Sequence, residues 1–340
     1  MKLVSYKTEG QEHLGVFANG HIYNLNSCDK LIPDSMSLFL NGGEEVMLKA
    51  KAINSLITNN KLHAKEEAFY ELMAPVPHPP SCRDAYAFKQ HVATARRNRK
   101  LEMLDEFNQY PVFYFTNHNS IQGPGDVECM PDHFERLDFE LEFAAVIGKK
   151  GRNIRAAEAD EYIAGFMIMN DLSARTLQME EMLLNLGPAK GKDFSTITGP
   201  WLVTPDELEQ YLTVPPEGHT GKAYNLEMIA RVNGVEVSNG NSETMSWTFA
   251  EIIERCAYGV DLFPGDIIGS GTVGTGCFLE LNGTGLLNNP DYKPQWLRDG
   301  DVVELQVTGL GVLTTSVKKS TDDFSILKLK KSLYEEHPAK

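Results

Sequence analysis

The feature that most constrains the fold is a succession of strand-like runs after residue 110. They cover residues 112–116, 137–147, 163–169, 226–237 and 302–317, and an Asn233-Gly234 turn interrupts the fourth. Helical patterns appear at 156–162, 173–186 and 248–256, the last with a Thr248-x-x-Glu251 capping box. Because strands and helices do not alternate regularly and no segment repeats, a TIM barrel or a doubly wound sheet is disfavoured. The sequence predicts a mixed, β-rich α+β protein.

The first 74 residues predict a separate small unit. Residues 14–25 alternate apolar and polar positions around Asn19-Gly20, a hairpin signal, and helical patterns follow at 36–40 and 44–56. A proline-rich connector, MAPVPHPP, spans 73–80. We therefore expect a β/helical N-terminal domain at 1–74, a main domain at 75–330 and a tail at 331–340.

Charge and hydropathy restrict the partners. The formal net charge of −15 disfavours nucleic acid and anionic membranes. The longest apolar stretches fall short of the roughly 20 residues that a membrane helix needs. The N-terminus lacks the apolar region of a secretory signal, and the five cysteines are scattered, so we expect a cytoplasmic protein with reduced thiols. A nucleophilic Cys82 beside His91 is the less favoured alternative.

The most informative segment is LDFELEFAAVIG at 137–148. Asp138, Glu140 and Glu142 alternate with apolar residues at the strand period of two, so their carboxylates should face one side. A solvated outer face is the plain interpretation. The following AAVIG does not alternate, which is typical of a strand buried on both faces. Carboxylates aligned beside a buried segment repel one another unless a cation neutralises them.

A further carboxylate ends the apolar strand FMIMND. Asp171 could simply cap the helix that follows, or it could bind the same cation. Arg175 and Gln178, three residues apart in that helix, should share a face pointing at what Asp171 binds. The next loop, GPAKGKDFSTITGP, brings Lys190 and Lys192. Its glycine spacing excludes a P-loop.

Upstream, RDAYAFKQHVATARRNRK contains Asp84, Tyr86 and His91. A lone histidine is often structural, but the densest basic cluster of the chain follows it, including Arg96 and Arg99. This cluster is either a solvated helix face or a carboxylate-binding lid. The segment GSGTVG at 269–274 matches the dinucleotide fingerprint, yet we expect a strand at CFLEL after it, where the fingerprint requires a helix.

Four motifs, LDFELE, GFMIMNDLSARTLQ, GPAKGKDFSTITGPWLVT and SGT followed by FLEL, together resemble the fumarylacetoacetate hydrolase family over residues 75–281. The resemblance implies a mixed β-roll catalytic domain preceded by a small N-terminal β domain, and a homodimer. It implies metal ligation by Asp84, Glu140, Glu142 and Asp171, and a water-activating dyad of His91 and Glu280. It also implies that substrate or oxyanion contacts come from a set of polar side chains: Tyr86, Arg175, Gln178, Lys192 and Thr272, with Thr196 as an outer or secondary metal residue.

An all-carboxylate site suits Mg²⁺ first, with Mn²⁺ or Ca²⁺ as alternatives. The resemblance implies a hydrolase that cleaves a carbon–carbon bond of a β-diketo acid, of the fumarylacetoacetate or acylpyruvate kind, through a metal-bound enolate. A lyase of the same family, an oxaloacetate-type decarboxylase or a 2-keto acid hydratase, is the alternative. A non-catalytic carboxylate-binding protein is the third hypothesis, and the complete set of metal, base and cation positions argues against it.

Overall fold

The computed structural model describes residues 1–331 of the 340-residue chain. Two large sheets, three two-stranded sheets and eight α-helices make up this part of the molecule, which confirms the expected β-rich α+β class. The predicted tail at 331–340 lies outside the described residues except for Lys331. Within residues 1–331, no helix is both long and apolar enough to span a bilayer.

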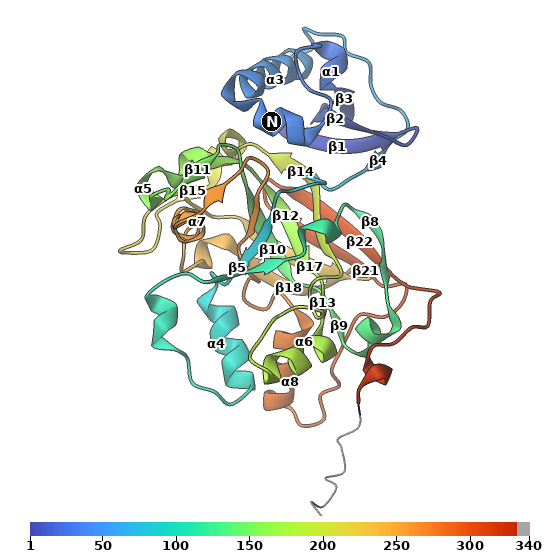
Figure 1. Ribbon diagram of the computed structural model, residues 1–340, viewed down its shortest axis with the longest axis vertical. Coiled ribbons are helices and arrows are strands. Elements are labelled where there is room, and N and C mark those ends of the chain that lie inside the picture. The colour runs from blue at the N-terminus through green and yellow to red at the C-terminus, as the bar shows by residue number, and fades with distance from the viewer. Residues whose placement is uncertain (332–340) are drawn as a thin grey trace, which may run out of the picture.

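The main sheet has 11 strands and passes through the centre of the molecule (Figure 1). Its order is β3-β2-β1-β14-β12-β10-β20-β5-β6, while β4 pairs with β1 and β7 with β14. The bounds are β1 Lys2–Thr8, β2 Gln11–Ala18, β3 His21–Asn24, β4 Glu71–Leu72, β5 Cys82–Ala85, β6 Phe113–Thr116, β7 Ile121–Gln122, β10 Leu141–Ile147, β12 Ile163–Asp171, β14 Thr196–Val203 and β20 Ile267–Gly269.

A second sheet of five strands has the order β18-β17-β21-β22-β8. Its strands are β8 Gly125–Cys129, β17 Glu227–Val232, β18 Val235–Asn241, β21 Val302–Val307 and β22 Gly311–Lys319. Ile168 of β12 and Leu313 of β22 belong to one buried apolar core, which joins the two sheets. Both predicted Asn-Gly turns connect paired antiparallel strands, with positive φ at each Asn and Gly.

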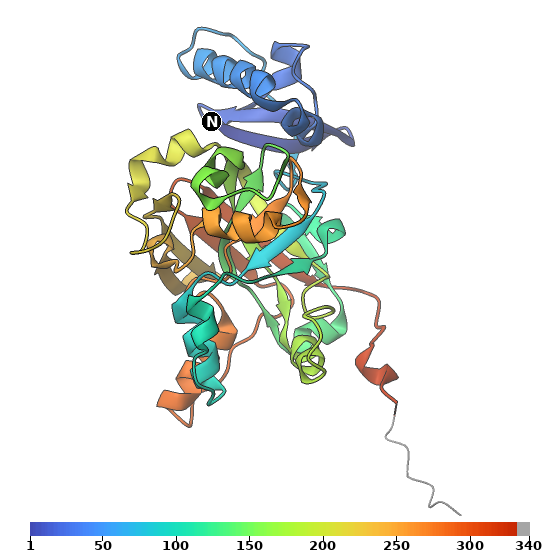
Figure 2. The ribbon, with the colours of Figure 1, turned by 60° about the vertical axis from the view of Figure 1, so that its left-hand side comes forward.

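The helices are α1 Leu25–Cys28, α2 Met36–Asn41, α3 Gly43–Thr58, α4 Lys89–Asn98, α5 Ala156–Ala159, α6 Arg175–Leu183, α7 Phe249–Ala257 and α8 Phe278–Asn288. The N-terminal unit with α3 lies at one end of the molecule, whereas α4, α6 and α8 gather toward the other (Figures 1 and 2). The α7 helix has the predicted capping box between Thr248 and Glu251.

The N-terminal unit and the main domain share the large sheet. β1 pairs with β14 through Leu3 opposite Leu202, and a second apolar core contains residues from both parts. The hairpin and the two helices expected in residues 1–74 are present. The division at residue 74 itself stays a prediction.

Strand β10 shows why the AAVIG segment does not alternate. Phe143 and Ala145 pack into the core between the sheets, whereas Ala144 and Val146 pack into the second core on the opposite face. The strand is therefore buried on both faces, as its composition predicts. The solvated-face interpretation of the acidic run is wrong.

Three sequence-based expectations about element boundaries are wrong. The run 137–147 is not one strand, because β9 (Leu137–Asp138) pairs with β13 (Ser173–Ala174) and β10 starts only at Leu141. The helix expected at 173–186 is shorter, since its first two residues form β13. The segment after the glycine-rich GSGTVG is helix α8 and not a strand.

A helix after GSGTVG is the element that a dinucleotide fingerprint requires, so a different feature of the structure excludes a dinucleotide site here. The first amides of α8, from Phe278 and Leu279, donate to the carboxylate of Asp138 at 2.7 and 2.9 Å. The Asp138 carboxylate thus already accepts the hydrogen bonds of these two amides. They cannot also donate to a pyrophosphate, which the dinucleotide fingerprint requires.

Candidate active site

Four carboxylates meet where the central strands of the main sheet end. Glu142 is in β10, Glu140 directly precedes that strand, Asp171 ends β12, and Asp84 is in β5. β10 lies between β12 and β20, and β20 pairs with β5, so the sheet order brings Asp84 beside Asp171, 87 positions further along the chain. One oxygen from each carboxylate lies within 4.8 Å of the others, and all four side chains are buried.

Burial and mutual repulsion keep protons on this cluster. Burial, followed by the charge of Asp171, raises the pKa of Asp84 to about 8. Burial and then the charges of Asp84 and Glu140 raise the pKa of Glu142 well above its usual range. Burial likewise raises the pKa of Asp171. Carboxylates this close cannot all ionise without a compensating cation.

Glu140 behaves differently because two cations contact it. Burial alone would raise its pKa, but the Lys192 ammonium and the Arg175 guanidinium hold it below the usual range. Lys192 Nζ lies 2.5 Å from Glu140 Oε2 and 2.6 Å from Asp171 Oδ2. Lys192 therefore lies at the edge of the cluster as a buried counter-charge.

The cluster fits a divalent cation. Asp171 Oδ1 is buried and has no hydrogen-bond partner among the described residues, although its Oδ2 accepts from Lys192 and from the Tyr114 hydroxyl. A divalent cation coordinated by oxygen atoms would give this unpartnered Asp171 oxygen a ligand contact, with the three other carboxylates as further ligands. Asp84, Glu140, Glu142 and Asp171 are thus the residues that could hold a metal.

Arg175 connects the cluster to its surroundings. Its Nε donates to Asp138 Oδ2 at 2.8 Å, one terminal nitrogen donates to Glu140 Oε1 at 2.8 Å, and the other donates to Gln178 Oε1 at 3.0 Å. Arg175 and Gln178 therefore share a face, as their spacing predicts. Asp138 is not a member of the cluster, because its carboxylate pairs with Arg175 and with the N-terminus of α8.

His91 and Glu280 form a buried pair. His91 is in α4 and Glu280 in α8, and His91 Nδ1 lies 2.8 Å from Glu280 Oε2. Asn98 also donates to the Glu280 carbonyl, which holds the two helices together. When Glu280 accepts a hydrogen bond from a protonated Nδ1, the neutral ring has its lone pair on the other nitrogen, Nε2, which can then act as a base.

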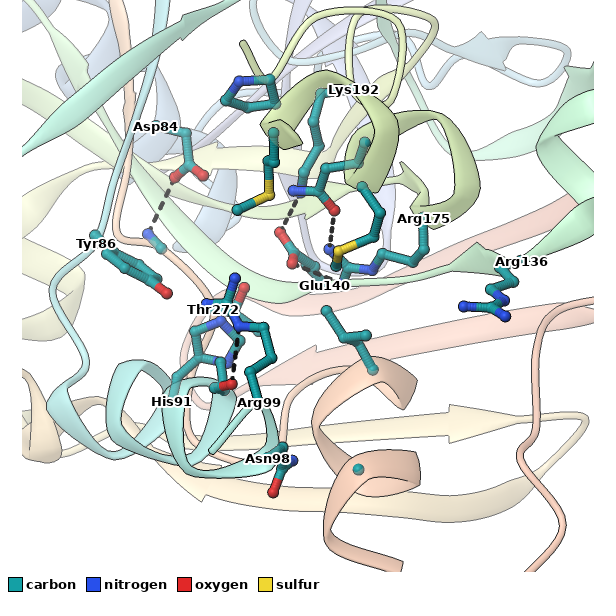
Figure 3. Close-up of a pocket in the computed structure, with 18 of the residues that line it drawn as sticks. Asp84, Tyr86, His91, Asn98, Arg99, Arg136, Glu140, Arg175, Lys192 and Thr272 are labelled. Atoms are coloured by element: carbon teal, nitrogen blue, oxygen red, sulfur yellow. Dashed lines mark hydrogen bonds and ion pairs between the residues drawn. The ribbon is translucent and has the colours of Figure 1, made fainter. Parts of the chain in front are cut away.

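The cluster and the pair open into one cavity of about 640 Å³ (Figure 3). Most residues singled out from the sequence line it: Asp84, Tyr86, His91, Arg99, Glu140, Arg175, Gln178, Lys192 and Thr272. Glu142, Asp171 and Glu280 lie behind this lining, in contact with residues that form it. Arg96 is not among the described residues that line the cavity, and its Nε donates to the Glu102 carbonyl.

Comparison with known proteins places this site in a family. The sequence model described as "Fumarylacetoacetate (FAA) hydrolase C-terminal" matches residues 81–318. The chain belongs to the fumarylacetoacetate hydrolase family. The expected β-roll catalytic domain after a small β unit agrees with the fold of its relatives, and the two sheets of this member are open.

Relatives match along almost the whole chain. A Rattus norvegicus protein named mitochondrial oxaloacetate tautomerase is 30% identical over 328 residues, with 93% of this chain and 91% of the relative covered. The human protein of that name is 29% identical over 327 residues, with the same coverage. Among solved structures, the fumarylacetoacetate hydrolase of Exiguobacterium antarcticum has a TM-score of 0.71 at 26% identity, covering 94% of this chain and 100% of that one.

The structure also shows cavity residues that the sequence reasoning missed. Tyr114 donates to Asp171, Arg136 lines the cavity just before β9, and Trp296 lines it beyond α8. Tyr114 is within a predicted strand, but a single tyrosine in a strand does not indicate a ligand contact. Thr196 is placed opposite Asp171 in the β12–β14 pairing and approaches Thr116, so its role as an outer metal residue stays a prediction.

Proposed function

We propose that this protein catalyses keto–enol proton transfer on a 2-oxo acid with a second carbonyl group two carbons away, oxaloacetate being the shortest example. The observation that supports it is the shared cavity. A carboxylate cluster suited to a cation and a His–Glu pair suited to proton transfer border the same space. Relatives named oxaloacetate tautomerase support the same chemistry.

The buried pair supplies the base. Nε2 of His91 takes a proton from the carbon between the two carbonyl groups, and the C–H electrons form the carbon–carbon double bond of the enolate. The same nitrogen then returns the proton to the oxygen, which yields the enol. Glu280 holds the ring orientation and stabilises the imidazolium that forms between the two steps. No atom or electron is gained or lost overall.

The remaining residues bind and orient the acid. A divalent cation held by the four carboxylates would act as a Lewis acid toward the substrate oxygens. We expect Mg²⁺, because carboxylate oxygens are hard ligands and Mg²⁺ is a hard cation. The Thr272 hydroxyl and the Gln178 amide border the same part of the cavity and can donate to negative oxygens. Lys192 favours the ionised form of Glu140 and holds both Glu140 and Asp171 in place through its two ion pairs.

The test follows the decay of enol-oxaloacetate absorbance with Mg²⁺-loaded protein. His91→Ala should lower the catalysed rate by about 10²- to 10⁴-fold, the usual contribution of a positioned acid–base group. The matched control is His78→Ala, because the His78 side chain is 73% exposed and is outside the cavity lining. A His91→Ala variant as active as wild type would refute the assignment of the base.

Hydrolytic cleavage of an acylpyruvate is the second candidate, and the cavity favours it. A volume of about 640 Å³ is typical of pockets for ligands larger than a four-carbon acid. The same His91 nitrogen could deprotonate a water that attacks the distal carbonyl. Product analysis by mass spectrometry separates the candidates, since hydrolysis adds water and yields two acids whereas tautomerisation leaves the mass unchanged. Release of CO₂ from oxaloacetate would instead indicate the lyase alternative.

A further inference from the structure

The fold brings one cysteine to the His91–Glu280 pair. One ligand atom each from His91, Cys277 and Glu280 lies within 4.8 Å of the other two, and all three side chains are buried. Cys82, the neighbour of His91 in the sequence, instead lies in the second apolar core. The contact arises because Cys277 is the N-cap residue of α8, the helix that carries Glu280 and that Asn98 of α4 contacts. The cysteine beside the base is therefore Cys277.

Cys277 is not a nucleophile for the proposed reaction. Burial, followed by the charge of Asp138, raises the pKa of its thiol well above the usual range, so the sulfur keeps its proton at neutral pH. Cys277 is also not among the described residues that line the cavity. Sulfur, imidazole nitrogen and carboxylate oxygen are, however, the three donor types that bind Zn²⁺ in proteins. The three side chains together thus suggest a metal site.

The spacing of the three donors suits a tetrahedral ion. Zinc lies about 2.3 Å from sulfur and about 2.0 Å from nitrogen or oxygen, so its ligand atoms are about 3.3 to 3.8 Å from one another. The donor atoms already meet within 4.8 Å, and His91 Nδ1 lies 2.8 Å from Glu280 Oε2. Shifts of about 1 Å or less would complete the geometry. Because His91 lines the cavity, the cavity supplies both the path of entry and the space for a water as fourth ligand.

The three donors differ in kind from the carboxylate cluster. The cluster presents only oxygen atoms, which suit Mg²⁺, whereas sulfur and nitrogen donors favour softer ions such as Zn²⁺. The two groups have no residue in common, and in Figure 3 His91 extends from α4 apart from Asp84 and Lys192. A hard ion and a soft ion would therefore find separate ligand sets around one cavity.

We infer that His91, Cys277 and Glu280 form a second metal site, which binds Zn²⁺ and inhibits the enzyme. The ion takes the place of the thiol proton of Cys277, which passes to water. Whichever ring nitrogen of His91 binds the ion, Nε2 has no lone pair left for catalysis. It is either the ligand itself or, when Nδ1 is the ligand, the nitrogen that carries the ring proton. Inhibition rests on the proposed function, in which His91 is the base, but binding of the ion does not.

Co²⁺ absorption tests the site without turnover, because a bond between Co²⁺ and a thiolate gives a near-ultraviolet charge-transfer band that oxygen ligands do not give. Full-length protein in excess Mg²⁺ is titrated with Co²⁺, and Zn²⁺ is then added. Wild type should develop the band and lose it to Zn²⁺. Cys277→Ser, which nearly keeps the size of the side chain, should lack the band. Cys129→Ala, at a buried cysteine outside the cavity lining, is the matched control and should keep it. Glu142→Gln should keep it too, because that change affects only the carboxylate cluster.

Inhibition of the Mg²⁺-loaded enzyme by Zn²⁺ is the second measurement, with each variant compared to its own rate without Zn²⁺. Loss of a residue that only hydrogen-bonds a metal ligand already costs about 10- to 100-fold in metal affinity. Loss of the sulfur ligand in Cys277→Ser should therefore raise the Zn²⁺ concentration for half inhibition by about 100-fold. Cys129→Ala should leave that concentration unchanged.

The outcomes separate the site from the reaction. A wild-type protein without the band, or a band that survives Cys277→Ser, overturns the site. A band that is lost in Cys82→Ala and kept in Cys277→Ser would place the sulfur ligand in β5 instead. If the band depends on Cys277 but Zn²⁺ does not slow an active enzyme, the inhibitory role is overturned. If the band depends on Cys277 and wild type does not convert enol-oxaloacetate, the proposed function fails while the zinc site stands.

Discussion

Replacing Asp84 with Asn should stabilise the metal-free protein at neutral pH while it weakens the cation site. The Asp84 side chain is buried, and its pKa is raised from 3.8 to about 8 by burial and by the charge of Asp171. Between these two values the folded protein keeps a proton that the unfolded chain has released. Stability therefore falls as pH rises from about 4 to about 8, and an amide that never ionises escapes this loss.

The magnitude follows from the pKa difference. At pH 7 the unfolded carboxyl group is about three pH units above its pKa, and each unit corresponds to about 1.36 kcal/mol, so the upper limit of the gain is about 4 kcal/mol. Glu142 is close enough to share protons with Asp84, which spreads the effect over both groups. We therefore expect a gain of about 2 kcal/mol at pH 7 and none at pH 4. The amide oxygen can still accept the Gly271 N–H that Asp84 Oδ1 accepts at 3.1 Å.

The assay is urea denaturation in the presence of a chelator at several pH values between 4 and 8.5. Asp291→Asn is the control, because Asp291 is exposed and the change should alter stability equally at every pH. Added Mg²⁺ should stabilise wild type strongly and the Asp84→Asn variant weakly. A stability difference that does not depend on pH would refute the reasoning that repulsion and burial hold protons on the cluster.

The other predictions concern binding and catalysis. Glu142→Gln should collapse Mg²⁺ affinity in calorimetry with an unchanged circular dichroism spectrum, since it removes charge but not volume; retained affinity would contradict the cation site. Glu280→Gln should lower kcat, and combined with His91→Ala it should be less than additive because the two residues act as a unit; additive losses in steady-state kinetics would separate them. Arg99→Glu should raise KM for anionic substrates more than it lowers kcat, whereas Arg96→Glu, outside the cavity lining, should leave both constants nearly unchanged. Equal effects of the two variants would show that only the net charge of this helix, and not a contact from Arg99, influences substrate binding.

The acidic run shows which parts of the site the sequence predicts. Its carboxylates recur at every second residue, and the apolar segment that follows does not alternate. This pattern is sufficient to place Glu140 and Glu142 beside a buried strand. It could not show that the strand breaks before Leu141, because that break depends on distant partners. Asn170 accepts the Glu140 amide with its side chain, and Asp138 turns to Arg175. Period arguments assume an unbroken strand, so they assigned Asp138 to the same face.

The second limit concerns segments that have helical and strand character at once. The short apolar run CFLEL fits a strand, yet its FLEL begins α8, because the carboxylate of Asp138 stabilises the helix N-terminus from 140 residues away. The pairing of His91 with Glu280 came from the family resemblance and could not have come from spacing, since 189 residues separate the two. Tyr114 and Arg136 reach the cavity through sheet pairing and a loop, for which a single sequence contains no local pattern.

Asp138 explains how the His91–Glu280 pair keeps a fixed position relative to the carboxylate cluster. Its carboxylate holds the first turn of α8, the helix that carries Glu280, and it holds Arg175, which in turn binds Glu140 of the cluster. Burying this carboxylate is unfavourable in itself, and burial raises its pKa despite the contact with Arg175. The fold accepts that cost at a position where an apolar side chain would fill the same space but could neither cap α8 nor orient Arg175. The remaining carboxylate of the acidic run therefore serves the site without belonging to the four-carboxylate cluster: it fixes the distance between the His91–Glu280 pair and that cluster.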